Sequence, residues 1–168
     1  MKKNKSKFSV RCAEFRDAAQ IFALIRMYPE ELLQRSIGDI VQNIDRFLLC
    51  EIEGTVAGVV SWQILPEIGI PTKPSVEIKS LAVMEKYRGI GVGKALVLKA
   101  MEHIKPLNPR QIIALTFTPA FFASLGFKET PKSELMHKIY AGCINCIKYD
   151  SPFTCPEQAM SFDLDGQS

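Results

Sequence analysis

The 168-residue sequence predicts a single mixed α/β (α+β) domain, and three observations support this fold class. Apolar residues recur with helical spacing early in the chain, and apolar runs of strand length follow in the middle. A glycine-rich turn then joins one such run to another helical pattern. Hydrophobic residues make up 47% of the chain and charged residues 23%, as in ordinary globular domains. A chain of this length can bury a sizeable core within one domain, 1–168.

The first half of the sequence predicts a strand, two helices and a β-hairpin. Ser36, followed three residues later by Asp39, resembles a capping box and marks the start of the second helix. The dipeptide Glu53-Gly54 between two apolar runs is a hairpin signal. The expected elements are a strand over 8–12, a helix over 21–28 that Pro29 ends, a helix from Ile37 to Ile44, and strands over 47–52 and 55–65.

The second half predicts alternating strands and helices, followed by a less regular end. Gly126 is expected to cap the last of these helices. The expected elements are a strand over 76–83, a helix over 91–104, a strand over 111–115 and a short helix over 120–125. Residues 138–168 are expected to be only loosely structured, and residues 1–7 to form a flexible basic tail.

A glycine-rich turn is the most informative motif of the chain. The run Leu81-Ala82-Val83 is followed by YRGIGVGK at 87–94, which has three glycines in five residues. Glycine lets the backbone approach a ligand closely, and the unpaired N–H groups of a following helix attract anions. The spacing differs from GxGxxG and from GxxxxGK[ST], the two common nucleotide loops. The turn therefore predicts a phosphate-bearing cofactor of another kind.

Residues 88–93 fit [RQ]-x-x-G-x-[GA] and resemble the acetyl-CoA pyrophosphate loop of the GCN5-related N-acetyltransferases, the GNAT superfamily. The preceding SLAV at 80–83 and the later FFASLGF at 121–127 strengthen this resemblance. It implies a mixed, mostly antiparallel sheet that splays near Val83, with helices on both faces and acetyl-CoA in the splay. The cofactor-binding residues that it implies are Leu81, Ala82, Val83, Arg88, Gly89, Ile90, Gly91, Val92, Gly93, Lys94 and Phe122.

Further segments resemble, in order, the short bacterial N-acetylglutamate synthases of arginine biosynthesis. They are LQRS at 33–36, VEIKSLAV at 76–83, ALT at 114–116, LMHKIY at 135–140, CINC at 143–146 and CPEQAM at 155–160. The resemblance implies an amino-acid N-acetyltransferase that uses acetyl-CoA, with L-glutamate as the expected acceptor and direct attack in a ternary complex. The alternative acceptors are glutamine, another small amine or a protein N-terminus. A further alternative is a catalytically silent sensor that binds CoA.

Glu77 is the candidate catalytic base. It lies six residues before the last residue of the LAV run, Val83, where the histone-acetyltransferase branch of the superfamily has its base. An amine must lose a proton to attack the thioester, and a carboxylate can take that proton. Strand alternation would place Glu77, Lys79, Leu81 and Val83 on one face. The alternative is a solvent-exposed Glu77 paired with Lys79.

Four residues are candidates for acceptor binding: Arg35, Ser36, Lys79 and Thr116. A guanidinium such as that of Arg35 can hold a carboxylate through two parallel hydrogen bonds. Lys79 stands where the family has arginine and offers only a point charge, so an ordinary surface lysine is the alternative. The alternative for Ser36 is that it serves only as a helix cap. Thr116 falls in a segment that resembles the family.

Two further features concern the general acid and metals. Phe122 stands where many superfamily members have a tyrosine that protonates the leaving thiolate, so the general acid is unassigned. Cys143, Cys146 and Cys155 are expected to be packed thiols, and no metal is expected. The alternatives are a zinc site with His137 as a fourth ligand, or a redox pair.

Charge and cysteine content bear on partners and compartment. Four lysines of the N-terminal segment contribute much of the net charge of +3, which disfavours nucleic acid as a partner. No apolar run reaches the length of a membrane span, and none follows the basic tail, so the tail is not expected to be a signal peptide. Five cysteines, an odd number, favour reduced thiols and a cytoplasmic protein. The expected partner is a small amino-acid acceptor, and a homodimer stays open.

Overall fold

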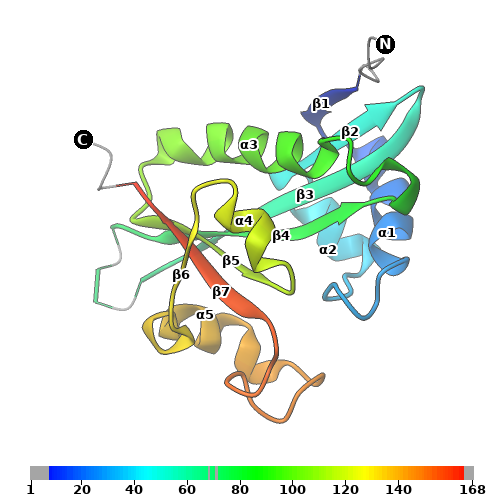
Figure 1. Cartoon of the computed structure of the whole chain (residues 1–168). Helices are drawn as coiled ribbons and strands as arrows, with labels where there is room; N and C mark the ends of the chain where they lie inside the picture. The colour runs from blue at the N-terminus through cyan, green and yellow to red at the C-terminus, as the bar shows by residue number, and fades with distance from the viewer. Residues whose placement is uncertain (1–7, 68, 71, 165–168) are drawn as a thin grey trace. The chain divides into compact units, whose positions relative to one another are not determined.

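The computed structural model describes residues 8–67, 69, 70 and 72–164, and the predicted basic tail lies outside them. The chain forms two compact units, one made of residues up to Trp62 and Ile78–Glu102, the other of Gln63–Glu77 and residues from His103 on. Two strands, β3 (Thr55–Leu65) and β4 (Ser75–Val83), contribute residues to both units (Figure 1). That the chain is one domain remains a prediction.

The first unit confirms the elements predicted for the N-terminal half. Its strands follow one another in the order β1-β2-β3-β4, and the β1/β2 and β2/β3 pairs are antiparallel. Glu53 and Gly54 have φ angles of 49° and 75°, as a tight hairpin turn requires. The remaining elements are β1 (Ser9–Cys12), α1 (Ala18–Arg26), α2 (Ile37–Gln42), β2 (Phe47–Ile52) and α3 (Val92–Ile104).

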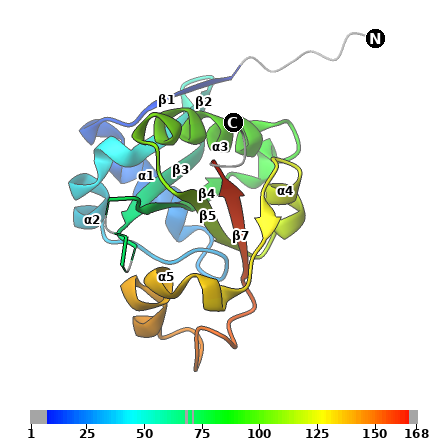
Figure 2. The same cartoon turned by 90° about the vertical axis from the view of Figure 1, so that its left-hand side faces the viewer.

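Two helix faces cover opposite sides of these strands (Figures 1 and 2). Ile21 and Ile25 of α1 and Ile40 of α2 pack in one buried cluster with Val59 of β3. On the other side, a Cβ at Gly58 would lie only 2.9 Å from Leu96 Cδ1 of α3. The lack of a side chain at Gly58 therefore lets α3 pack directly on β3.

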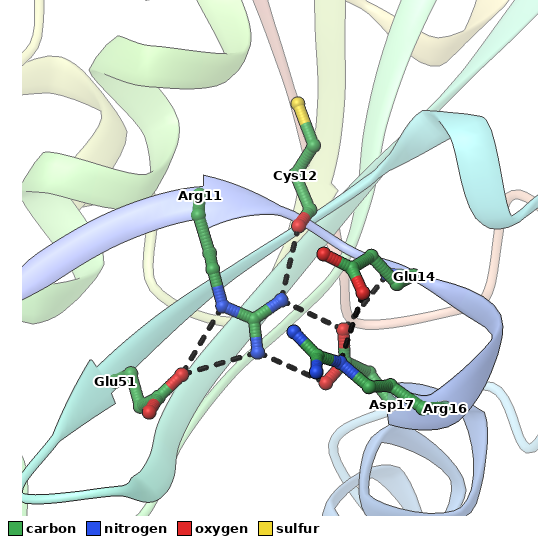
Figure 3. Close-up of polar contacts among 6 residues, drawn as sticks. All are labelled: Arg11, Cys12, Glu14, Arg16, Asp17 and Glu51. Carbon is green, nitrogen blue, oxygen red and sulfur yellow. Dashed lines mark hydrogen bonds and ion pairs between the residues drawn. The ribbon is translucent and has the colours of Figure 1, made fainter.

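Arg11 of β1 joins three segments of the first unit through charged hydrogen bonds (Figure 3). Its Nη1 and Nη2 donate to the two carboxylate oxygens of Asp17 at 2.8 and 3.0 Å, and its Nε donates to Glu51 at 3.1 Å. Asp17 also accepts from the backbone N–H of Glu14 at 2.8 Å. These hydrogen bonds from Arg11 and from the backbone hold the pKa of Asp17 below its ordinary value, although burial opposes them.

We expect Asp17→Asn to lower the free energy of unfolding at pH 7 by ~1–3 kcal/mol, because a hydrogen-bonded charge is lost. The stability that Asp17 contributes is present above its unfolded pKa, near 3.8, and is lost as the pH falls through its lower folded pKa. The difference in the free energy of unfolding between the variant and wild type should therefore narrow as the pH falls below about 3.8. Urea unfolding at pH 7 and pH 3 measures it, with the exposed Asp45→Asn as a control. A constant difference at both pH values would contradict this account.

The second unit contains the parallel pairing of the sheet and the end of the chain. Its strands follow the order β4-β5-β7-β6; β4 and β5 are parallel at Val76–Ile112 and Glu77–Ile113, whereas β5/β7 and β6/β7 are antiparallel. Its elements are β5 (Gln111–Thr116), α4 (Pro119–Ala123), β6 (Lys128–Glu129), α5 (Met136–Ala141) and β7 (Gln158–Asp163).

The expectation of a loosely structured end at 138–168 is wrong for two segments. Residues 138–141 belong to α5, and β7 pairs with β5 at six positions from Gln111–Asp163 to Thr116–Gln158. Backbone hydrogen bonding to β5 fixes β7 even though its sequence shows little alternation, and Figure 2 shows the two strands side by side. The structure confirms the mixed, mostly antiparallel sheet. The splay near Val83 remains a prediction.

Within the described part of the chain, none of the helices combines the length and the apolar character needed to span a bilayer.

Candidate active site

The glycine turn has the backbone that its sequence predicts. Gly89 and Gly91 adopt φ angles of 79° and 98°, a region that side chains with a Cβ rarely occupy. Gly89, Ile90 and Gly91 are exposed, whereas Val92 is buried and anchors the start of α3. The first N–H groups of a helix lack acceptors within it. The turn therefore presents a surface of backbone donors, with Gly93 and the exposed Lys94 in the same helical turn.

Arg88 fastens this turn to the end of β4. Its Nε donates to the carbonyl oxygen of Val83 at 3.1 Å. Its guanidinium lies 4.8 Å from the ring centre of Tyr28 and 3.7 Å from Glu31. The side chain of Arg88 is thus engaged with groups of the protein itself, and a contact from Arg88 to a cofactor remains a prediction.

Ser80 interrupts strand β4 with a φ of 54°, in the left-handed region. A non-glycine residue rarely adopts this conformation, so the backbone of β4 is irregular at this position. That Glu77, Lys79, Leu81 and Val83 share one face stays a prediction. Ala82 is buried in the cluster formed with α1 and α2, and Leu81 and Val83 are half-buried.

Arg35 lies against the first unit's strands with a side chain that is only 10% exposed. Its Nη1 donates to Ser61 Oγ at 3.1 Å and to Ser80 Oγ at 3.3 Å. It also forms an ion pair with Asp39 and stacks on Phe47. Because Arg35 is held on several sides, it is a rigidly placed cation.

Lys79 and Arg35 are linked through Ser61. Ser61 Oγ donates to the backbone carbonyl oxygen of Lys79 at 3.2 Å, and the side chain of Lys79 is half-buried. Ser36 is exposed, and its Oγ accepts from the N–H of Asp39 at 3.1 Å. The observed contact of Ser36 is that of a helix cap, the alternative interpretation. Acceptor binding by Ser36 and Lys79 stays a prediction.

The second unit places Glu77 in a buried ion pair. Glu77 is 4% exposed, and its Oε2 lies 2.8 Å from Nζ of Lys138 on α5. The ammonium and the carboxylate therefore form a close ion pair. The alternative of a solvent-exposed Glu77 is wrong.

Lys138 is the residue that the sequence interpretation missed at this position. Burial would lower its pKa, but the charge of Glu77 and a hydrogen bond to it outweigh burial and raise the pKa. Burial, together with the charge of Glu77, raises the pKa of the nearby Glu157. A lysine between His137 and Ile139 of a short helix carries no sequence signal of this pairing.

A second buried polar cluster surrounds Glu67. Ser75 Oγ donates to its Oε1 at 2.6 Å, and Arg110 Nη1 and His137 Nδ1 lie 3.4 and 3.5 Å from its Oε2. Burial lowers the pKa of His137 although Glu67 opposes this shift. His137 Nε2 has no hydrogen-bond partner among the residues that the structure describes. His137 thus belongs to the Glu67 cluster.

Cys143, Cys146 and Cys155 line a small cavity of about 40 Å³ in the second unit. Burial raises the pKa of the Cys143 and Cys155 thiols. In the part of the chain that the structure describes, no three metal-binding side chains are grouped so that they could hold an ion. All five cysteines are free thiols. The arrangement favours packed thiols and gives the zinc alternative no support.

Phe122 and Thr116 have mainly local contacts within the second unit. Phe122 is 4% exposed, and its ring lies edge-to-face with Phe121 and Phe127 at centre distances of 5.2 and 5.3 Å. Thr116 is buried, and its Oγ1 accepts from the N–H of Thr118 at 2.9 Å. Cofactor binding by Phe122 and acceptor binding by Thr116 remain predictions.

The structure thus groups the candidate residues within each unit. The first unit holds the glycine turn, the backbone of 81–83 and the Arg35–Ser61–Ser80 contacts. The second unit holds Glu77 with Lys138. An open hollow of about 540 Å³ beside Arg11 in the first unit is lined by none of the predicted site residues. It is polar and carries the charges of Arg11, Asp17 and Glu51, which already pair with one another.

Sequence comparisons agree with the motifs. Residues 13–127 match the acetyltransferase (GNAT) family model. An uncharacterized N-acetyltransferase of Chlorobaculum tepidum is 33% identical over 153 residues, which cover 90% of this chain and 93% of the relative. An amino-acid acetyltransferase of Mycobacterium tuberculosis is 26% identical over 146 residues, which cover 84% of this chain and 79% of the relative.

Solved structures share the fold. A Mycobacterium tuberculosis protein in complex with CoA superposes with a TM-score of 0.76 at 24% identity, covering 93% of this chain and 99% of that chain. N-acetylglutamate synthase from Neisseria gonorrhoeae, complexed with coenzyme A and N-acetyl-glutamate, gives a TM-score of 0.75 at 23% identity and covers 94% of this chain. This chain spans about a third of the Neisseria chain, 35%. With a family match over most of its length and a relative that aligns nearly end to end, the chain belongs to the GNAT family of acetyltransferases.

Proposed function

We propose that this protein transfers the acetyl group of acetyl-CoA to the α-amino group of an amino acid, with L-glutamate as the acceptor. The observation that carries the proposal is the buried carboxylate of Glu77 on β4, the strand that precedes the glycine turn in the chain. Relatives named amino-acid acetyltransferase support the substrate class. The activity would be that of an N-acetylglutamate synthase of arginine biosynthesis, and five free thiols fit a cytoplasmic enzyme.

The cofactor would be held mainly by backbone groups. The N–H groups of the turn from Gly89 to Gly93 and the N-terminus of α3 suit a pyrophosphate, because donors and dipole both favour negative charge there. The backbone of Leu81–Val83 would bond the pantetheine arm. One of these N–H groups would also stabilise the oxyanion that forms on the thioester carbonyl.

Glu77 would act as the general base. It would take a proton from the acceptor's ammonium or amine, and the nitrogen would then attack the thioester carbonyl carbon. The C–N bond forms, the C–S bond breaks, and CoA leaves as a thiolate that takes a proton from solvent. Phe122 has no proton to donate, and a thiolate leaves readily without a general acid.

Arg35 would bind the acceptor's carboxylate. Its contacts with Ser61 and Ser80 fix the guanidinium against the strands, so little conformational entropy is lost when a ligand binds. Lys79, which lies on β4 next to Ser80, would add a second positive charge. Two cations suit an acceptor that carries two carboxylates, as glutamate does, better than a neutral amine.

An acceptor panel tests the proposal directly. CoA release is measured with acetyl-CoA and either L-glutamate, L-glutamine, other amino acids or a peptide with a free N-terminus. We expect L-glutamate to give the highest kcat/KM. A faster reaction with glutamine would overturn the acceptor but keep the chemistry. Tight acetyl-CoA binding without turnover on any acceptor would instead indicate a CoA-binding sensor.

A further inference from the structure

We propose that Lys138 is a positioning residue for the reaction: its buried ammonium keeps the carboxylate of Glu77 ionised and oriented. The inference rests on the proposed function, because it assigns Lys138 to the carboxylate that serves as the base. It depends on the contact within the second unit, where Nζ lies 2.8 Å from Oε2.

Both partners are buried and held by regular structure. Glu77 is 4% exposed and lies where β4 pairs with β5, at Glu77–Ile113. Lys138 is 9% exposed on α5, and its helical neighbour Ile139 and the preceding Leu135 are buried. The N–H of Lys138 donates to the carbonyl oxygen of Leu135 at 2.9 Å. Neither side chain can therefore move into water without disturbing its own element.

A buried carboxylate loses its hydration and binds a proton more readily unless a positive charge lies close by. Among the described residues, Glu157, the Cys143 thiol and His137 also act on this pair, with Lys132 beside Glu157 and with Glu67 and Arg110 beside His137. Glu157 adds negative charge when it is ionised, and burial lowers the pKa of His137, which reduces its positive charge at neutral pH. Lys138 is the cation in contact with Glu77, so it balances the negative charge.

The ion pair leaves Glu77 able to accept a proton. Lys138 Nζ contacts Glu77 at Oε2, and an ionised carboxylate has about four acceptor sites, so one ammonium leaves lone pairs for a proton. A base that must bind an amine proton needs both properties, an ionised carboxylate and a free lone pair. Lys138 keeps the carboxylate ionised and leaves it a lone pair for the proton.

A titration that needs no turnover tests the electrostatic role. The protein is labelled with ¹³C at the glutamate carboxyl carbons, the Glu77 resonance is assigned with Glu77→Gln, and wild type is compared with Lys138→Met. We expect the midpoint of this resonance in Lys138→Met to move to higher pH by about one unit or more. The exposed Lys128→Met on β6 should leave it in place. An unchanged midpoint in Lys138→Met would overturn the proposal.

Kinetics separate this inference from the proposed function. With glutamate as acceptor, the acid limb of the kcat profile should move to higher pH in Lys138→Met and return towards wild type in Lys138→Arg, while the Kd for acetyl-CoA stays unchanged. If the Glu77 midpoint moves in Lys138→Met but wild type shows no turnover, the proposed function is refuted and the electrostatic role of Lys138 is not. If Lys138→Met does not fold, the double variant Lys138→Met/Glu77→Gln decides. Recovery of folding supports the pairing, and continued unfolding counts against it.

Discussion

Replacement of Glu77 by glutamine should lower kcat by about 10²-fold or more, the range in which general bases contribute. Glutamine keeps the size of the side chain but cannot take the proton of the attacking amine. The exposed Glu129→Gln on β6 is the matched control in the same unit and should keep wild-type turnover. The Kd for acetyl-CoA should be the same in all three proteins, because the cofactor's proposed contacts lie elsewhere.

The pH dependence sharpens this test. As the pH rises, a larger fraction of the acceptor is already a neutral amine and depends less on a base. The deficit of Glu77→Gln should therefore shrink at alkaline pH, in steady-state assays from about pH 6 to 10. Wild-type turnover of the variant over this whole range would remove Glu77 from the mechanism.

Replacement of Gly91 by alanine should weaken acetyl-CoA binding about tenfold or more, which corresponds to ~1.4 kcal/mol. Gly91 has a φ of 98°, and a Cβ in this region strains the backbone. The turn can relieve the strain by changing its conformation, because Gly91 is exposed and a Cβ there would lie 4.0 Å from its nearest neighbour, Phe8. That change would misalign the N–H groups that face the pyrophosphate.

Gly54→Ala separates the loss of stability from the loss of binding. Gly54 has a φ of 75° in the β2–β3 hairpin, and a Cβ there would contact nothing within 4 Å. Both variants should lose ~1–2 kcal/mol of stability from backbone strain. Calorimetric titration with acetyl-CoA should then show wild-type affinity for Gly54→Ala and reduced affinity for Gly91→Ala. Equal affinities would show that the glycine turn does not hold the cofactor.

Local signals account for what could be predicted from the sequence. The hairpin at Glu53-Gly54, the helix that follows the glycine turn and the positive φ angles of that turn all follow from a few neighbouring residues. The capping interpretation of Ser36 rests on the same kind of local signal, and the structure shows that contact. Each of these features depends on backbone propensity or on a short hydrophobic period.

The features that could not be predicted depend on residues far apart in the chain or on a single unusual backbone angle. Lys138 meets Glu77 across 61 positions (138 − 77), and no pattern within either segment indicates the contact. β7 is fixed by its partner β5 and not by its own alternation. The engagement of Arg88 with Val83 and Tyr28 likewise needs the folded chain.

The left-handed backbone of Ser80 has a consequence for how this protein can diverge. Its Oγ accepts a hydrogen bond from Arg35, so Ser80 combines an unusual backbone angle with a side-chain contact. A β-branched residue at this position would strain the backbone, and glycine or alanine would remove the oxygen that Arg35 contacts. Few residue types can therefore replace Ser80 without a cost, so this position is expected to accept fewer substitutions than its neighbours on β4.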